Sequence, residues 1–548
     1  MQINWDSFRT YNQDARGVRF KFEDLCRQLF ANENLSENKQ FKYLHSNPNN
    51  YGLEAEPIFD ESRQLWIGFQ AKFFDDSVKY AQIKEAAEKT VTYYTGKNGR
   101  VDLVYLFCNK PITSTAKTFV DTVNLLKKHS IELQLITDTA ILDLVSNKYP
   151  YLGLYYFCNH TINFEWFVAH ANHMYDDLGE RYNRGFNVET EFLDELSLFV
   201  HDQRAAEYLN AKKRNLLEEI DKLYWRRDQY RTYLYDLREI ILSLSDVDTE
   251  SLYTALKWEG IVKQQIQVDF DKFDEAVKQL KRQQEEAYDN AYNNAGSKEE
   301  KSKALEKVHD IGCQIYDLTV LIDLPDTITI NDRERSLLQG QVMLLSGRAG
   351  TGKSQLLATK IKTLLDVNRT ALLLVAGIYF TDNPIQEQII NNLRIDFSFE
   401  ELIDVLETIG EKNNCIVPVF IYALNETWNK KVWKTGLPLI ADKIKKAHMV
   451  RLVVSYRSEY EKLVLPDSMI NGEDDIVRIN HRGFEDNSIV AIREFLNHYN
   501  IPFTPLEYFG YEMSNPLFLT LYCKTYNGEE VSLPTLYERL IEKANAKR

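Results

Sequence analysis

One short motif constrains the fold of this chain more than any other feature. The stretch VMLLSGRAGTGKSQLL at 342–357 places a glycine, four further residues and Gly-Lys-Ser between an apolar run and a helical pattern. Glycines let such a loop wrap a phosphate with successive backbone N–H groups, and the dipole of the following helix favours the negative charge. The motif therefore predicts a strand, a phosphate-binding loop and a helix within an α/β domain.

The motif also predicts the contacts of a bound nucleoside triphosphate. Lys353 is expected to reach the β- and γ-phosphates, and the Ser354 hydroxyl is expected to ligate Mg²⁺. A purely structural glycine turn explains this spacing less well. We expect the whole loop to line the nucleotide, namely Gly347, Arg348, Ala349, Gly350, Thr351, Gly352, Lys353, Ser354 and Gln355.

Two later strands are expected to end beside this loop. The strand in IVPVFIYALNET, 416–427, lies where P-loop enzymes keep an aspartate that holds Mg²⁺, but here Tyr422 ends the strand and Glu426 follows it. The next strand, in MVRLVVSYRSEY at 449–460, brings Arg457 to its C-terminal edge. Ligands of open α/β sheets bind at that edge. Arg457 is therefore expected to contact phosphate, or else to form a surface ion pair.

A second group of polar residues lies in the N-terminal third. Alternate residues of a strand share a face, so the stretch LWIGFQAKFF at 65–74 places Gln70 and Lys72 side by side. The preceding stretch, YGLEAEPIFD, carries Glu54 and Glu56 on one face. A hairpin centred near Ser62 would place Glu54 opposite Gln70, and a slip of two residues would substitute Glu56.

An acid, a second oxygen ligand and a lysine on one hairpin face suit a metal-dependent phosphodiesterase. Oxygen ligands favour Mg²⁺ or Mn²⁺, and the metal makes a bound water nucleophilic near neutral pH. Glu54 and Gln70 are the expected ligands, Glu23 on the preceding helix could add a carboxylate, and Lys72 would stabilise the developing charge. The alternative is a solvated sheet face on which Glu54 simply pairs with Lys72.

The rest of the chain divides by texture into two α/β regions and one helical region. The N-terminal third alternates helix patterns at 18–31 and 78–95 with strand patterns at 53–59, 65–74, 101–109 and 131–137. Residues 200–310 read as helical, with two apolar stripes, one from Leu216 to Ile241, interrupted at Arg227, and one from Phe270 to Ala291. Stripes with this 3-4 spacing predict an antiparallel helix pair, most simply a spacer.

Composition excludes several classes of protein. The net charge is −15, yet residues 1–150 carry 19 Lys and Arg against 19 Asp and Glu, so only the first third is neutral enough to approach nucleic acid. Six scattered cysteines without a C-x-x-C pair argue against zinc or a disulfide framework. With no secretory signal and no long apolar run, a cytoplasmic protein without a membrane anchor is expected.

The phosphate-loop half resembles a known family. GRAGTGKSQLL, FIYALNET, RLVVSYRSEY, INHRGF and NPLFLTLYC follow the order and spacing of STAND NTPases and look most like the antiviral STAND (Avs) proteins of bacteria. The resemblance covers roughly 320–545 and implies an ATP-dependent oligomerisation switch whose helical lid touches nucleotide at Pro516. That family usually has Asp where this chain has Tyr422, which argues against fast hydrolysis and leaves Glu426 as a water-orienting acid.

The N-terminal third resembles the PD-(D/E)xK nucleases, specifically the Mrr-like restriction branch, in which Gln-x-Lys replaces the acidic residue before the lysine. Glu54, Gln70 and Lys72, with Glu23 upstream, carry the match over roughly 15–145. STAND modules commonly carry N-terminal nucleases. The resemblance implies metal-dependent cleavage of double-stranded DNA.

These observations predict a multidomain α/β protein with four regions. We expect a restriction-endonuclease-like domain at 1–160, a helical connector at 161–318, a P-loop NTPase core at 319–480 and a helical lid at 481–548. The expected function is antiphage defence, by an ATP-gated, Mg²⁺- or Mn²⁺-dependent endonuclease that assembles as a homo-oligomer, a tetramer by family resemblance.

Two further expectations concern the trigger and the alternatives. Family members sense a phage protein through long C-terminal repeats, so the sequence is expected to be a fragment or a short form whose sensor lies on a partner. The alternative function is a signalling or scaffold ATPase whose nuclease fold binds DNA or a partner without cutting. An ATP-driven restriction translocase ranks lowest because no acidic box follows the phosphate-binding loop.

Overall fold

A computed structural model describes most of the chain and divides it into two compact units. The described residues are 3–12, 17–34, 51–60, 62–94, 99–158, 162–183, 188, 191–226, 230–294, 297–379, 381–472, 476–484, 488–502, 511–526 and 538. The first unit joins Met1–Leu193 to Gly340–Arg548, and the second is Asp194–Gln339. The α/β class predicted from the sequence is confirmed, since the first unit contains two sheets with parallel strands.

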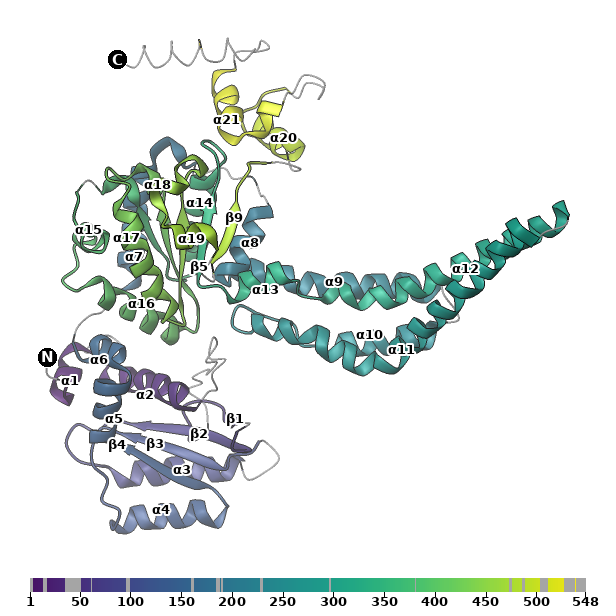
Figure 1. Cartoon of the computed structure of the whole chain (residues 1–548). Coiled ribbons are helices and arrows are strands. Elements are labelled where there is room, and N and C mark those ends of the chain that lie inside the picture. Colours follow the sequence, from purple (N-terminus) through teal and green to yellow (C-terminus); the bar gives the residue numbers. More distant parts are fainter. Residues whose placement is uncertain are drawn as a thin grey trace. The chain divides into compact units, whose positions relative to one another are not determined.

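The N-terminal part of the first unit contains a four-stranded sheet in the order β1-β2-β3-β4 (Figure 1). The strands are β1 (Ile58–Asp60), β2 (Leu65–Lys72), β3 (Leu103–Cys108) and β4 (Glu132–Thr137). Strand β1 is antiparallel to β2, whereas β2, β3 and β4 run parallel. Parallel strands need crossover helices, and α3 (Tyr80–Tyr94) and α4 (Lys117–Lys128) supply them.

Helices cover both faces of this sheet, which buries β3 completely. In Figure 1, α3 and α4 lie on one face and α2 (Val18–Asn34) on the other. On the α2 face Phe30 stacks on Phe69 with ring centroids 4.9 Å apart. The remaining helices of this part are α1 (Trp5–Tyr11), α5 (Asp138–Asp143), η1 (Leu144–Lys148) and α6 (Pro150–Phe157).

The predicted hairpin is wrong in length and in register. A strand was expected over 53–59, but β1 comprises three residues, and Ile58 pairs with Ile67 rather than with Trp66. Glu54 is therefore not paired with Gln70, and its N–H donates to the Phe69 carbonyl at 3.0 Å. Before this hairpin, Gly52 packs closely on α3, because its φ is +89° and an added Cβ would come within 2.2 Å of the Ala86 carbonyl oxygen.

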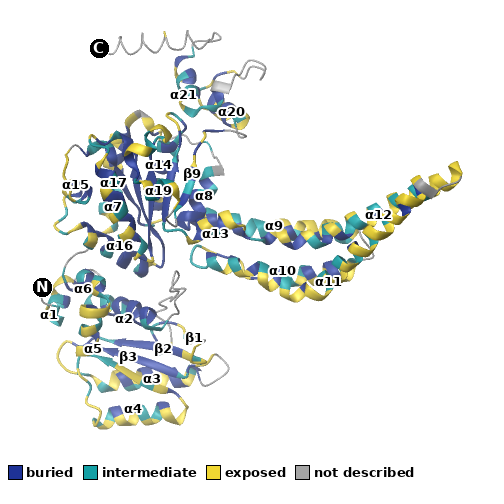
Figure 2. Cartoon of the chain, in the orientation of Figure 1, coloured by how far each residue is buried: buried dark blue, intermediate teal, exposed yellow. Residues whose placement is uncertain are grey.

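The second sheet of this unit is entirely parallel, in the order β6-β7-β8-β5-β9. Its strands are β5 (Val342–Ser346), β6 (Leu372–Val375), β7 (Val417–Tyr422), β8 (Val450–Ser455) and β9 (Val477–Asn480). Strands β6, β7 and β8 are buried along their whole length, as Figure 2 shows, whereas the edge strand β9 is only partly buried. The sequence predicted β5, β7 and β8 at these positions, and Tyr422 does end β7.

The helices around this sheet include one from the region expected to be the connector. Helix α7 (Phe164–Leu178), followed by η2 (Gly179–Arg181), packs on β6, and His170 Nε2 lies 2.7 Å from the Leu373 carbonyl oxygen. The connector therefore does not begin at residue 161. The other helices are α14 (Lys353–Asp366), η7 (Ala376–Ile378), α15 (Ile385–Leu393), α16 (Phe399–Asn413), η8 (Leu424–Glu426), α17 (Val432–Lys445), η9 (Ser458–Tyr460), α18 (Glu461–Val464) and α19 (Asp467–Asn471).

A small helical cluster follows β9. Helices α20 (Ser488–His498), η12 (Tyr511–Ser514) and α21 (Pro516–Thr525) share a core that includes Phe484, Phe495 and Leu519. Asn515 caps α21, because its side-chain oxygen accepts from the N–H groups of Leu517 and Phe518. The expected lid was 481–548. Beyond residue 526 only residue 538 of it is described.

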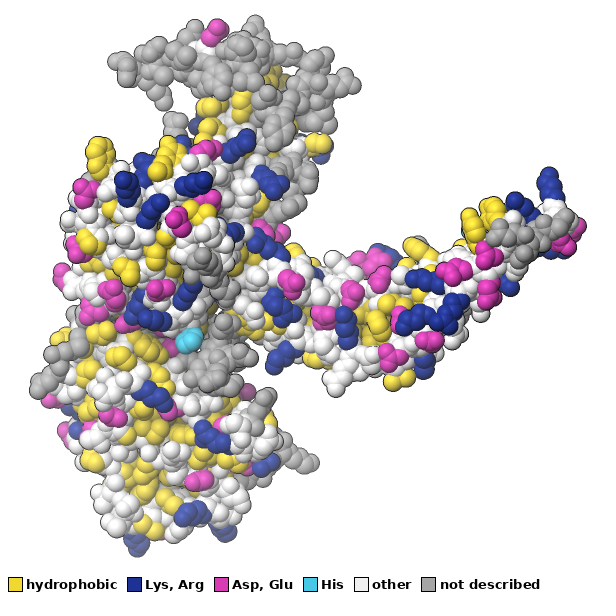
Figure 3. Space-filling view, in the orientation of Figure 1, with side chains coloured by type: hydrophobic (Ala, Val, Ile, Leu, Met, Phe, Trp, Pro, Cys, Tyr) yellow, Lys and Arg dark blue, Asp and Glu magenta, His cyan; other side chains and the backbone are white. Residues whose placement is uncertain are grey.

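The second unit is helical. Its longest pair is α11 (Ala255–Asp289) and α12 (Lys298–Asp323), which pack along each other. The first predicted stripe is divided between two helices, and Arg227 lies outside the described residues. On the face in Figure 3, cationic and anionic side chains are interspersed over this unit. Its other helices are α8 (Glu191–Val200, which begins in the first unit), α9 (Gln203–Arg226), α10 (Arg231–Ser243), η4 (Leu252–Thr254), η5 (Asn290–Asn294), η6 (Leu324–Ile328) and α13 (Asp332–Gln339).

Two sequence-level exclusions can be compared with the structure. Within the described ranges no helix has both the length and the apolarity to cross a membrane. All six cysteines are free thiols, so no disulfide framework exists.

Candidate functional site

The phosphate-binding loop joins the carboxyl end of β5 to the start of α14. Strand β5 ends at Ser346 and α14 begins at Lys353, so the intervening residues form the predicted loop. Gly352 has φ +98°, a left-handed conformation that glycine adopts without strain. The backbone N–H groups at the start of α14 are orphan donors, which suits the loop to an anion.

The Lys353 side chain turns back to contact the loop that precedes it. Its Nζ donates to the carbonyl oxygens of Gly347 and Arg348, both at 2.7 Å, and to Thr351 Oγ1 at 3.2 Å. Burial, together with the charge of Arg457, lowers the pKa of Lys353 to about 8. Among the described residues no ion pair to this ammonium is found, and a phosphate would supply one.

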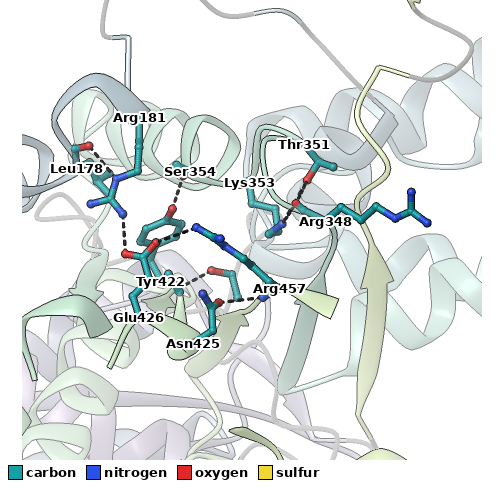
Figure 4. A network of polar contacts seen from close by, with 12 residues as sticks. Leu178, Arg181, Arg348, Thr351, Lys353, Ser354, Tyr422, Asn425, Glu426 and Arg457 are labelled. Carbon is teal, nitrogen blue, oxygen red and sulfur yellow. Dashed lines mark hydrogen bonds and ion pairs between the residues drawn. The ribbon is translucent and has the colours of Figure 1, made fainter. Parts of the chain in front are cut away.

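Ser354 is hydrogen-bonded to the phenol of Tyr422. Its Oγ lies 2.5 Å from the hydroxyl of Tyr422, which stands at the end of β7 (Figure 4). Burial raises the pKa of Tyr422, so the phenol is neutral. The side chain that the sequence places in the aspartate position thus contacts the serine directly.

Glu426 is held between two guanidinium groups. Arg181 Nη1 donates to Glu426 Oε2 at 2.6 Å, and Arg457 Nη2 lies 3.7 Å from Glu426 Oε1. Arg181 also lies over the Tyr422 ring, 5.6 Å from its centroid. The backbone of Arg457 is positioned by Asn425, whose side-chain oxygen accepts its N–H at 2.9 Å. Arg457 therefore reaches both the pocket and the acid.

The residues of the loop and of the neighbouring strand ends enclose a cavity of about 460 Å³. Gly350, Lys353, Glu426, Arg457 and Pro516 all line it. The structure thus brings together the predicted residues of the nucleotide site except Gly347 and Arg348, which are not among the residues that line the cavity. Figure 4 shows the Arg348 side chain directed away from the other labelled residues.

The start of α21 closes one side of this cavity. The Leu517 N–H donates to the Gly350 carbonyl oxygen at 3.0 Å. A Cβ added at Gly352 would lie 3.4 Å from Pro516 Cγ, in ordinary contact. Pro516 is therefore directly against the loop, as the family resemblance implies for a lid.

Sequence analysis missed three residues of this site. Arg181 ends η2, and Asn183 lies two residues beyond it and exchanges two hydrogen bonds with Gln355, at 2.8 and 3.0 Å. His481 follows β9, is 2% exposed, and has its pKa lowered to about 3 by burial and by Lys353. Nothing in the sequence near Arg181 marks it, whereas the resemblance included His481 within INHRGF without assigning it a role.

The second predicted site contains a close acid–base pair. Lys72 Nζ lies 3.3 Å from Glu54 Oε1, and the two side chains are 23% and 21% exposed. The same carboxylate oxygen accepts the Ala71 N–H at 3.2 Å. This pair alone is equally expected of a solvated sheet face, so it does not distinguish the two interpretations.

Glu23 adds a second carboxylate to this pair. Burial and then the charge of Glu54 raise the pKa of Glu23 to about 7, against the smaller opposing influence of Lys72. The charge of Glu54 therefore acts on Glu23, although the two acids come from separate segments. A bound cation would relieve that repulsion, so Glu23 and Glu54 fit a divalent metal.

Gln70 and Glu56 lie elsewhere. Gln70 is 2% exposed, and its amide nitrogen lies 3.5 Å from Thr90 Oγ1 on α3, so its contact is with a covering helix. Glu56 is exposed, and its charge acts on Tyr94. In the part of the chain that the structure describes, no group of three or more His, Cys, Asp or Glu side chains could hold a metal.

Comparisons with known proteins give distant matches among solved structures. No protein-family model matches the chain, and no curated protein matches it. Among solved structures, a Walker-type ATPase of Pyrococcus abyssi is similar with a TM-score of 0.28 and 16% identity, over 39% of this chain and 70% of that chain. A match this weak adds nothing to what the loop, the strand order and the cavity themselves establish. The chain is an α/β protein with a glycine-rich phosphate-binding loop between β5 and α14.

Proposed function

We propose that this chain is an ATP-binding switch that gates a metal-dependent DNA endonuclease in antiphage defence. The nucleotide half rests on the loop itself, with Lys353 paired to carbonyl oxygens in a 460 Å³ cavity beside strand ends. The nuclease half rests on the resemblance to Mrr-like enzymes and on the acid pair beside Lys72. Both lie in one compact unit.

One observation carries the nuclease half, namely the contact of Lys72 Nζ with Glu54 Oε1 at 3.3 Å, with Glu23 near enough for the charge of Glu54 to raise its pKa. A bound Mg²⁺ or Mn²⁺ would be held by the two carboxylates and would supply an activated water and charge neutralisation. Lys72, at the end of β2, would stabilise the charge that develops on the phosphate. Gln70 contributes from behind, by packing the end of β2 against α3.

ATP is proposed to support assembly of several copies, which would bring nuclease domains together on duplex DNA. A tetramer is the arrangement that the family resemblance suggests, and a phage protein is the proposed trigger. Tyr422 in place of an acid favours a slow ATPase or none, so that binding rather than turnover sets the assembled state.

The test is a cleavage assay with linear and circular duplex DNA, in Mg²⁺ or Mn²⁺, with and without ATP and with candidate phage proteins. Wild-type cleavage should require metal and should disappear in Lys72→Ala. The matched control is Lys89→Ala, because Lys89 forms an exposed pair with Glu85 at 2.7 Å in the same domain. Cleavage that survives Lys72→Ala would refute the nuclease site.

The burial of Gln70 favours a second candidate, a scaffold whose nuclease fold binds DNA without cutting it. A side chain held against Thr90 is not available as a metal ligand, which leaves two acids where the nuclease pattern has three oxygen donors. DNA binding without cleavage under every metal, nucleotide and trigger condition would support this candidate.

A further inference from the structure

The nucleotide crevice differs from the Mg²⁺-binding crevice of other P-loop proteins at Tyr422, the position where those proteins have an acid that holds the metal. In P-loop proteins the loop serine ligates Mg²⁺, and an acid at a neighbouring strand end holds it. Here Ser354 Oγ is bonded at 2.5 Å to the Tyr422 hydroxyl. A neutral phenol offers no charge to a divalent cation. Its hydroxyl also lies where a metal bound to Ser354 Oγ would have to sit.

The nearest acid cannot take over the role while its present contacts persist. Both oxygens of Glu426 face guanidinium groups, Arg181 at 2.6 Å and Arg457 at 3.7 Å. The Arg181 contact is a hydrogen bond between ionised partners, a kind that is roughly twice as strong as a neutral one. Binding Mg²⁺ through Glu426 would therefore cost the Arg181 contact. The donor set does not fit the expectation that Ser354 holds Mg²⁺.

The same crevice is rich in fixed positive charge. Four cationic side chains line the cavity, and Glu426 is the only acid among the described residues that line it. The cations are Arg181, Lys353, Arg457 and Lys524. Arg181 and Arg457 come from different elements and meet at one carboxylate, so incoming phosphate oxygens could replace that carboxylate as their partner.

We propose that this crevice binds a nucleoside triphosphate without requiring Mg²⁺, because side-chain cations provide the neutralisation that the metal provides elsewhere. The inference deepens the proposed function at its nucleotide site and rests on nucleotide binding there. Tyr422 is the positioning residue, since it holds Ser354. Arg181 supplies a cation from a segment outside the loop.

The experiment measures the affinity of the full chain for a fluorescent ATP analogue in excess Mg²⁺ and in excess chelator. Wild-type affinity should differ by less than about threefold between the two buffers. In Tyr422→Asp, Mg²⁺ should improve affinity by about tenfold or more, because the carboxylate restores a partner for the metal. Tyr422→Phe keeps the ring and removes only the hydroxyl, so it should fold like the wild type and remain insensitive to chelator.

The outcomes separate this inference from the function on which it rests. A loss of tenfold or more in wild-type affinity on chelation would overturn the Mg²⁺ independence and leave nucleotide binding intact. No binding in either buffer would overturn nucleotide binding itself. If Tyr422→Asp does not fold, the wild type still decides the proposal, because a tenfold or greater loss of its affinity on chelation would overturn it.

Discussion

The two candidate sites each place a lysine near acids, but their electrostatics are opposite. In the loop, burial and Arg457 lower the pKa of Lys353 to about 8, so positive charge is in excess. In the N-terminal domain, burial and Glu54 raise the pKa of Glu23 to about 7, so negative charge is in excess. Where burial and a like charge disfavour the charged form of a side chain, a ligand of the opposite charge stabilises that form. This difference favours an anion as the ligand of the first site and a cation as the proposed ligand of the second.

Exchanging the two lysines for alanine gives the largest expected contrast. Lys353→Ala should weaken nucleotide binding by about a hundredfold, because an ammonium–phosphate contact contributes about 3 kcal/mol. Lys72→Ala should leave nucleotide affinity unchanged and remove cleavage. Fluorescence titration with nucleotide and the DNA assay measure the two effects on the same preparations.

A matched variant controls for general damage to α14. Lys362 on that helix pairs with Asp366 at the surface, so Lys362→Ala should bind nucleotide like the wild type. Equal losses in Lys353→Ala and Lys362→Ala would mean that the loop lysine has no special role.

Removing Arg181 should have the next largest effect. Arg181→Gln takes one cation from the crevice and releases Glu426, whose charge then opposes phosphate. Nucleotide affinity should fall by about ten- to thirtyfold in titration. Arg100→Gln is the control, since Arg100 forms an exposed pair with Asp102 in the N-terminal domain. Unchanged affinity in Arg181→Gln would remove Arg181 from the site.

These residues differ in how far the sequence could identify them. The loop was predictable because one contiguous motif contains the strand end, the glycines and the helix start. Tyr422 and Arg457 were predictable as strand ends, since apolar runs set the strand limits. Arg181 was not, because it lies 245 residues before Glu426 and only the fold brings the two together.

The N-terminal site was harder to predict for a physical reason. Alternation correctly placed Gln70 and Lys72 on one face, but it could not reveal that α3 covers Gln70 and leaves Lys72 partly exposed. It also missed the hairpin register by one residue and the close packing of Gly52 against α3. The covering of Gln70 and the packing of Gly52 both depend on α3, whose position a local pattern does not contain.

The pH dependence of nucleotide binding sharpens the first half of the comparison. In the free protein Lys353 loses its proton above pH 8, whereas bound phosphate favours the charged form. Binding then takes up a proton, so affinity should fall by up to about tenfold between pH 7 and 9. Titrations across this range measure it, with Lys353→Arg expected to be flat because its guanidinium stays charged. If wild-type affinity did not change with pH, the lowered pKa of Lys353 would be contradicted.

The smallest expected effect is on protein stability, and it tests the excess of negative charge at the N-terminal site. The pKa of Glu23 is raised in the folded protein, so between about pH 4.5 and 7 the native state binds more protons than the unfolded state. The free energy of unfolding should therefore fall as pH rises through this range, by less than about 1.4 kcal/mol per pH unit because the carboxyl is partly exposed. Glu23→Gln should flatten this slope in urea unfolding. Mg²⁺ should restore stability to the wild type at pH 8 and do less for the variant, since the cation relieves repulsion that the amide lacks. Equal Mg²⁺ stabilisation of both proteins would mean that Glu23 is no part of a cation site.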